Sequence, residues 1–192
     1  MAENSVAPVA RGKTFFDGGT VDTSGGKHLE GTVHVFPNTD PDDTTNRRDG
    51  GNVTCILVRN SHSAALLPGI VVKWKTDATS GSELVEGREV VGGDIGLKAR
   101  AAGVVDDHLP AAGVPVGDLF WLVVKGQCKC TVDGAVAAGA IVLSAAADGH
   151  VKSQTSLSNL EQLYAIGING GHSTISDNGT GVINVNILTN GV

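Results

Sequence analysis

The chain has 192 residues, a mass of 19.5 kDa, a formal net charge of −6 and a pI near 5.4. Its 14 Lys and Arg are scattered and its aromatic content is 4%, which argues against nucleic-acid binding, because such proteins usually carry a basic face with stacking aromatics. The 27 glycines are well above the usual share, whereas charged residues, at 18%, are below it. Many tight turns between short strands would explain both values.

No apolar run approaches the ~20 residues needed to cross a bilayer, and the first residues lack the apolar core of a signal peptide. We therefore expect no membrane partner and a protein that is made and kept in a cytoplasm. Cys55, Cys128 and Cys130 are odd in number, and the last two project from one strand face at a spacing that constrains a mutual disulfide. Buried free thiols are expected.

Residues 1–30 are rich in glycine, with Phe15 and Phe16 as their large apolar anchor. We expect an extended N-terminal arm that lies across a neighbouring subunit, with a flexible tail as the alternative. Arg11-Gly12-Lys13-Thr14 ends like a phosphate-binding loop. However, Ala7 stands at the required glycine and no strand precedes the motif, so no nucleotide site is expected.

A β-rich domain is expected over residues 31–192. Residues 31–36 alternate valine with polar residues, which predicts a first strand. The following loop, 37–52, is long and polar and carries Arg47 and Arg48. A loop of this length is usually functional or mobile, so it either contacts a partner or is a plain surface excursion.

Further strands are predicted by alternating or continuous apolar residues at 53–59, 70–75, 83–91, 94–105, 119–125, 127–132, 141–143, 150–152, 164–168 and 182–188. One short helix is predicted at 157–163, with Ser156 or Ser158 as its cap. The similar units at 64–69 and 135–139 suggest two similar lobes. A division into 31–105 and 106–192 is the corresponding expectation.

The segment 113–151 is the most informative part of the chain. Residues 119–125 are a continuous apolar run, typical of a buried strand. In residues 127–132 the apolar side chains alternate with polar ones, so one face meets water. Asp133-Gly134 then supplies a turn, and the segment as a whole is a succession of short strands with almost no reactive side chains.

This segment resembles the small capsid decoration, or cement, proteins of tailed bacteriophages, in which a GD-F-V-KG…V-DG-V-AGD-L type of pattern recurs. The residues that carry the resemblance are Gly117, Asp118, Phe120, Val123, Lys125, Gly126, Val132, Asp133, Gly134, Val136, Ala138 and Gly139. The segment 53–74 is similar to those proteins as well, through its order of strand, polar turn, ALLPG and strand.

The resemblance implies a structural virion protein that binds the outer surface of a phage capsid and stabilises the shell by bridging major capsid subunits. It implies a homo-oligomer, a trimer, and no enzymatic activity. The expected fold is all-β, a sandwich or barrel-like domain of short strands with an extended arm and long loops. The last strand is expected to be an unpaired edge that could add to a neighbour's sheet. Candidate capsid or inter-subunit contacts are Phe15, Phe16, Arg47, Arg48, Val182, Ile183, Val185 and Ile187.

The sequence also has features of two other functions. The sequence AGVVDDH at 102–108 is similar to the glycine, hydrophobic, aspartate motif of trimeric dUTPase-like nucleotide hydrolases, in which Asp106 would activate water. Paired aspartates are more typical of a turn. A carbohydrate-binding β-module would stack Trp74, Trp121 or Tyr164 on sugars, but Trp121 lies in the most hydrophobic strand, which predicts a core role.

The histidines are not spaced like zinc ligands. No metal and no cofactor are therefore expected. No G-x-S-x-G sequence that would expose a nucleophilic serine is present either.

Overall fold

The computed structural model describes residues 11–14, 30–38, 51–76, 88–93, 101–145, 149–154, 165–171 and 173–187. Within these ranges the regular structure is entirely β, which confirms the all-β prediction. The strands are β1 Val33–Pro37, β2 Asn52–Asn60, β3 Val71–Trp74, β4 Glu89–Val91, β5 Ala101–Val105, β6 Leu119–Thr131, β7 Ile141–Ser144, β8 Val151–Gln154, β9 Ala165–Asn169 and β10 Thr180–Asn186. The predicted helix at 157–163 and most of the predicted arm lie outside the described residues.

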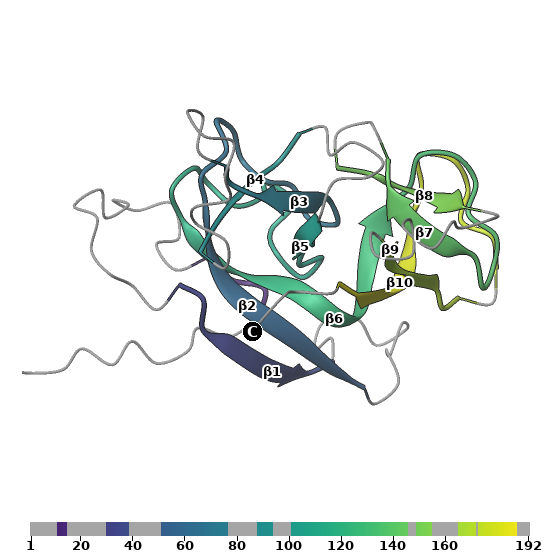
Figure 1. Cartoon of the computed structure of the whole chain (residues 1–192), viewed down its shortest axis with the longest axis horizontal. Helices are drawn as coiled ribbons and strands as arrows, with labels where there is room; N and C mark the ends of the chain where they lie inside the picture. The colour runs from purple at the N-terminus through teal and green to yellow at the C-terminus, as the bar shows by residue number, and fades with distance from the viewer. Residues whose placement is uncertain are drawn as a thin grey trace, which may run out of the picture.

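Two barrels of five strands share the long strand β6 (Figure 1). Lobe 1 has the order β2-β4-β3-β5-β6, and β6 pairs back onto β2. Lobe 2 has the order β6-β10-β9-β7-β8, and an isolated bridge between Val132, which directly follows β6, and Val151 of β8 closes it. In both lobes the first strand meets the third in parallel, through Arg59↔Glu89 in lobe 1 and the bridge Val132↔Val151 in lobe 2. The two lobes therefore have the same topology in the same chain order.

The lobes join within β6 and not between residues 105 and 106. The sequence suggested the latter position, whereas β5 pairs with the first half of β6, inside lobe 1. Lys125 pairs with Thr54 of lobe 1 and with Asn186 of lobe 2, so the strand changes lobe at this residue. Gly126 follows with a φ of 108°, and a Cβ there would lie 2.7 Å from the Asn52 carbonyl oxygen. Glycine is therefore required where the two lobes meet.

Each lobe is closed by two turns that cross each other. The bridges Leu66↔Val114 in lobe 1 and Val136↔Ile175 in lobe 2 mark the crossings. Three residues after each bridge residue the backbone enters the left-handed region, at Gly69, Gly117, Gly139 and Asn178. Asparagine is the residue that best replaces glycine in this conformation.

One asparagine in each lobe holds the crossing turns together. The Asn60 Nδ2 donates to the carbonyl oxygens of Ala64, Val114 and Pro115 at 3.1, 2.8 and 3.1 Å. The Asn169 Nδ2 donates in the same way to the carbonyl oxygens of Val136, Ala137 and Ser173 at 3.1, 3.0 and 3.2 Å. Both asparagines are buried, and the Oδ1 of each accepts from the backbone N–H two residues later. Backbone groups that no strand pairs are satisfied by these two side chains.

Two apolar clusters form the core. The first cluster, which includes Ile56, Phe120 and Leu122, fills the barrel of lobe 1. The second cluster uses the opposite face of the same strands and continues into lobe 2, with members Leu57, Trp121, Val123, Cys128, Val142, Ile166 and Ile183. The strands of lobe 1 are thus buried on both faces, which explains the continuous apolar run at the start of β6.

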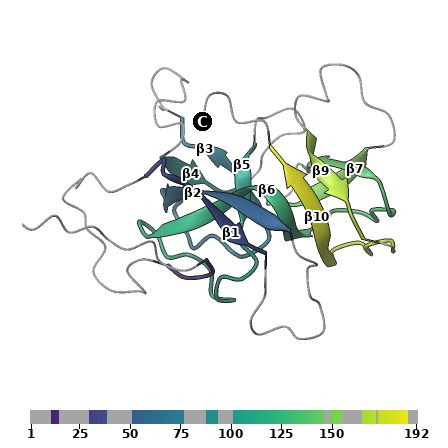
Figure 2. The ribbon, with the colours of Figure 1, turned by 90° about the horizontal axis from the view of Figure 1, so that it is seen from below.

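The strand β1 covers the outer face of lobe 1. It pairs antiparallel with β2, and Figure 2 shows it lying at the outside of the lobe. The ring of Phe36 meets the ring of Trp121 edge to face, with centroids 5.2 Å apart, and the ring of His34 lies 5.9 Å from the same indole. Trp121 is buried in this way, as its position in an apolar run predicts. The described residues contain no helix that is long and apolar enough to cross a membrane.

Candidate functional site

Arg11 anchors the N-terminal segment 11–14 to the loop that follows β5. Its Nε donates to the Asp106 Oδ2 at 2.7 Å, its Nη2 to the Asp106 Oδ1 at 3.0 Å, and its Nη1 to the Asn38 Oδ1 at 2.8 Å. The Arg11 side chain is 8% exposed and that of Asp106 is fully buried. A fork of two parallel hydrogen bonds from arginine to one carboxylate is stronger and more specific in geometry than a single neutral hydrogen bond.

Gly12 permits this docking. Its φ is 82°, and a Cβ on it would lie 2.8 Å from the His108 carbonyl oxygen. Arg11 and Gly12 therefore pack against residues 106–108. They belong to the motif that ends like a phosphate-binding loop. Arg11 and Asp106 belong to separate motifs of the sequence, and 95 residues separate them along the chain.

Asp106 is not placed to act as a water-activating base. Its side chain is fully buried, and both of its oxygens accept hydrogen bonds from Arg11. A general base must reach the proton that it removes, directly or through one water molecule. The geometry of this carboxylate is that of a structural partner for Arg11, in agreement with the turn expected from the paired aspartates.

Asp106, Asp107 and His108 bring possible metal ligands together, with ligand atoms within 4.8 Å of one another. However, the Arg11 Nη2 lies 3.9 Å from the Asp107 Oδ1, in addition to its contact with Asp106. The Cys128 Sγ also donates to this Asp107 oxygen, at 3.3 Å. The Arg11 guanidinium therefore already lies beside both carboxylates and offsets part of their negative charge.

The three thiols are free and buried, which confirms the expectation from the sequence. Burial raises the pKa of the Cys55 thiol far above its usual value, and the negative charge of Asp106 raises it further, whereas Arg11 acts in the opposite direction. A thiol that stays protonated is a poor nucleophile. Cys55 therefore acts as a small apolar side chain of the core.

The tryptophans are also part of the core. Trp74 is 2% exposed and Trp121 is 3% exposed, so neither presents a face on which a sugar could stack. Tyr164, the third aromatic weighed for that purpose, lies outside the described residues. The side chains of a carbohydrate site are therefore not found where the sequence suggested them.

The candidate contact residues fall into two groups. Phe15, Phe16, Arg47 and Arg48 lie outside the described residues. The predicted edge position of the last strand is wrong, because β10 pairs with β6 on one side and with β9 on the other. Of the side chains named there, Val182 is half-buried, while Ile183, Val185 and Ile187 belong to the core. The alternating pattern of that strand reflected burial inside lobe 2.

Exposed large apolar side chains are found on β1 and also at Leu67, Val116 and Ile168. Val33 and Val35 are 42% and 51% exposed, although both belong to a strand. The strand is paired on one side, with β2, among the residues that the structure describes. The sequence predicted this strand, but not that it would be the free edge.

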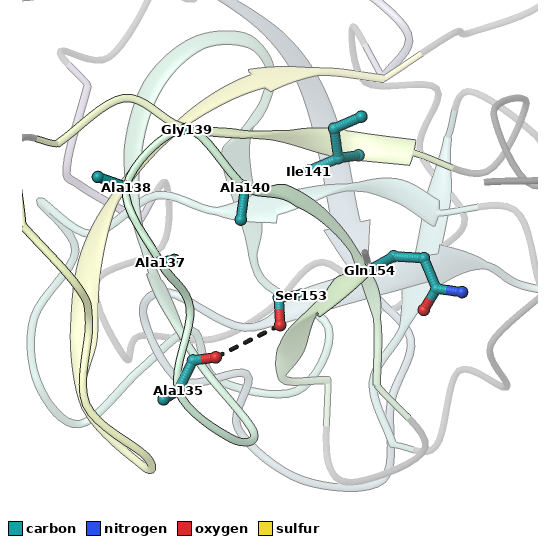
Figure 3. Close-up of a pocket in the computed structure, with 8 residues that line it drawn as sticks. All are labelled: Ala135, Ala137, Ala138, Gly139, Ala140, Ile141, Ser153 and Gln154. Carbon is teal, nitrogen blue, oxygen red and sulfur yellow. Dashed lines mark hydrogen bonds between the residues drawn. The ribbon is translucent and has the colours of Figure 1, made fainter. Parts of the chain in front are cut away.

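A groove of about 400 Å³ lies on lobe 2, beside the turn that carries Gly139. It is lined by small residues of the segment 135–141 and by Ser153 and Gln154 of β8. Figure 3 shows the segment curving past β8, with the Ser153 Oγ donating to the Ala135 carbonyl oxygen at 3.3 Å. Few of its groups are chemically reactive, so the groove is better suited to receive a polypeptide backbone than to perform a reaction.

Comparisons with protein-family models, with curated proteins and with solved structures find no match for this chain.

Proposed function

We propose that the protein is a structural component of a phage virion that binds the outer surface of the capsid and stabilises the shell by bridging major capsid subunits. One observation carries the proposal. The segment 113–151, which resembles the cement proteins, contains β6, the strand that both lobes share, and the turns before and after it. It also contains Gly126, where the two lobes meet.

The residues of the resemblance have structural roles of three kinds. Gly117, Gly126, Gly134 and Gly139 all have positive φ and set the turns and the change of lobe. Phe120, Val123, Val132 and Val136 are fully buried in the two core clusters. Asp118 is buried, and its Oδ1 accepts from the Leu119 N–H at the start of β6. A pattern made of framework residues supports a shared fold with that family.

The chemistry of the buried polar groups favours a binding function over catalysis. The Asp106 carboxylate is paired with Arg11, and burial keeps Cys55 in its thiol form. The side chains of Asn60 and Asn169 donate to backbone carbonyl oxygens of the turns. In a protein that binds by adhesion, many modest contacts add up when several copies bind one shell. The negative net charge is compatible with a protein on the outside of a shell.

Co-sedimentation with expanded, undecorated capsids tests the proposal. Saturable binding to the shell is expected, at a defined number of copies. Replacement of Phe15 and Phe16 together by alanine should weaken binding if the arm contributes, and replacement of Arg47 and Arg48 by alanine tests the loop 37–52 separately. These variants keep Arg11, whereas deletion of residues 1–30 would also remove the partner of Asp106.

A protein that stays in the supernatant at every concentration would contradict the proposal. Release of pyrophosphate from nucleoside triphosphates, lost in Asp106→Asn, would point to the hydrolase alternative. Quenching of tryptophan fluorescence by glycans would point to the carbohydrate-binding alternative.

A further inference from the structure

Lobe 1 contacts lobe 2 through the turn that carries Gly69. The Thr131 N–H of β6 donates to the Gly69 carbonyl oxygen at 3.0 Å, and the Val71 N–H donates to the Gly149 carbonyl oxygen at 2.7 Å. A Cβ on Gly69 would lie 3.1 Å from the Lys129 carbonyl oxygen. The turn therefore packs its backbone directly against the backbone of a strand in the other lobe.

Within the part of the chain that the structure describes, the corresponding turn of lobe 2 makes no such contact with the other lobe. Gly139 occupies the position of Gly69, three residues after the bridge residue Val136, but it is exposed and nothing lies within 4 Å of a Cβ placed on it. Among the described residues no hydrogen bond reaches its carbonyl oxygen. Ala137 and Ala138 beside it are exposed and line the groove of Figure 3. A surface that is covered in lobe 1 is thus open in lobe 2.

The free edge of β1 has the complementary properties. The Thr32 carbonyl oxygen accepts from Leu57, and the Asn38 N–H donates to Gly51, so the even-numbered residues of the strand direct their backbone groups toward β2. Antiparallel pairing alternates, so Val33 and Val35 direct their N–H and C=O groups outward. Their side chains are exposed large apolar ones, in a strand where Phe36 alone is not exposed. Pro37 has no N–H, which limits the donors of this edge to these two residues.

We infer that the groove beside Gly139 receives the β1 edge of a second copy of this chain. The contact continues the one between the lobes, in which a turn docks against an extended strand. In this contact the outward N–H groups of β1 donate to the Gly139 carbonyl oxygen. The exposed valine side chains of β1 lie in the groove, which is lined by alanines. β1 lies on lobe 1 and β7, which the groove adjoins, lies apart from it in both views (Figures 1 and 2), so the two surfaces meet between copies.

β1, and not β2, is the strand that docks in the groove, because the backbone groups of β2 on this side are already hydrogen-bonded. Leu57 and Arg59 hold in β2 the positions that Lys129 and Thr131 hold in β6. The equivalence follows from pairing, because β2 pairs with β6 in lobe 1 as β6 pairs with β10 in lobe 2. The Leu57 carbonyl oxygen already accepts from Gly31, and the Arg59 N–H already donates to Arg88. β1 lies along this side of β2, and its outer edge is the next one available.

The contact joins two different surfaces, so each copy can bind one neighbour by β1 and another by the groove. Contacts of this type close into rings or extend into chains. The inference deepens the proposed function, because it assigns the contact between copies that a homo-oligomeric cement protein needs. It is tested in solution without the shell, so its failure can be told from a failure of capsid binding.

Two variants break the two surfaces separately. Val35→Pro removes an outward N–H from β1, at an edge position that tolerates proline, and Ala138→Arg fills the groove. Each variant alone is expected to fall to the mass of one chain, 19.5 kDa, in light scattering and sedimentation at concentrations where the parent protein is oligomeric. An equimolar mixture of the two is expected to form dimers, because the intact groove of one variant can bind the intact β1 of the other.

Ala65→Arg is the matched control, because Ala65 is exposed in lobe 1 at the position that Ala135 has in lobe 2. It should leave the mass unchanged, and all variants should keep the far-ultraviolet spectrum of the parent protein. A parent protein that is monomeric over the whole concentration range would overturn the inference. So would Val35→Pro and Ala138→Arg variants that keep the parent's mass, or a mixture of two monomeric variants that stays monomeric.

Discussion

The two lobes have the same topology, but their outer faces differ in burial. In lobe 1 the cross-strand pair Leu57↔Trp121 is buried beneath β1. The corresponding pair in lobe 2 is Lys129↔Val182, and both of these residues are partly exposed. The same framework therefore carries an apolar outer face where β1 covers it, and a more polar one where no strand of the described residues does. What a lobe buries on its outside is set by its neighbours and not by its topology.

Trp121→Ala should produce the largest loss of stability. Removal of a buried tryptophan costs about 3 to 5 kcal/mol, because the apolar contacts are lost and a cavity remains. Val182→Ala, at the corresponding position of lobe 2, should cost about 1 kcal/mol, because this side chain is only partly buried. Urea unfolding of both variants measures the difference, and similar losses at the two positions would contradict the asymmetry of the outer faces.

Arg11→Met should cost about 3 kcal/mol, because it leaves the buried Asp106 carboxylate without its partner. The exposed pair Lys75–Glu89 is the control, with Lys75 46% exposed. Lys75→Met should cost less than about 1 kcal/mol, as exposed ion pairs do. Equal unfolding midpoints for the two variants would show that the segment 11–14 does not stabilise lobe 1. Arg11→Met combined with Asp106→Leu should recover part of the loss, since no buried charge then remains unpaired.

Asn60→Asp and Asn169→Asp form a matched pair across the lobes. Each change replaces a donor that faces three carbonyl oxygens by a carboxylate oxygen, so each should cost about 2 to 3 kcal/mol. Because the hydrogen bonds are the same in both lobes, the two losses should agree within about 1 kcal/mol. Unfolding followed by tryptophan fluorescence, which reports on lobe 1, and by circular dichroism, which reports on both lobes, would detect a lobe that unfolds alone. Asn184→Asp, at an exposed position of β10, is the control and should cost little.

Much of the fold could be predicted from local patterns. β6 illustrates this. Its continuous apolar run predicts a strand that is buried on two faces, and the alternation that follows predicts burial on one face. The left-handed turns could be located by their glycines, apart from Asn178. What could not be predicted depends on contacts far apart in the chain. The Arg11–Asp106 pair and the place of β10 between β6 and β9 are of this kind, because alternation shows that one face is buried and does not show which strands lie alongside.

The candidate site was harder to predict than the fold for the same reason. A free edge such as β1 and a paired strand such as β10 have similar alternating sequences, and their difference lies in which neighbours the barrel brings beside them. The open groove at Gly139 has no signature of its own, because the sequence around Gly69 has the same order of apolar residue, turn and strand. Contacts with the other lobe, such as that of Gly69 with Thr131, distinguish the covered turn from the open one.

The smallest effect is expected at Glu89, one of the two residues of β4 that pair with β2 in lobe 1. Burial raises the pKa of its carboxyl group, but hydrogen bonds from Lys75 and Ser61 and the charges of Lys75 and Arg59 outweigh burial, so the pKa is lowered from 4.5. A carboxylate whose pKa is lowered by folding stabilises the folded state above its unfolded pKa. The stabilisation is lost as the pH falls through the lower, folded value.

Glu89→Gln removes this titration and should cost less than about 1 kcal/mol at neutral pH, because the group is partly exposed. The difference in unfolding free energy between the parent protein and Glu89→Gln should therefore shrink below a pH of about 4.5. Urea unfolding at several pH values from neutral to acid measures it. Lobe 2 has Val132↔Val151 at the corresponding parallel contact, where no acid titrates, so Val151→Ala should give a loss that is the same at every pH. A difference for Glu89→Gln that does not change with pH would mean that the carboxylate contributes through packing and not through its charge.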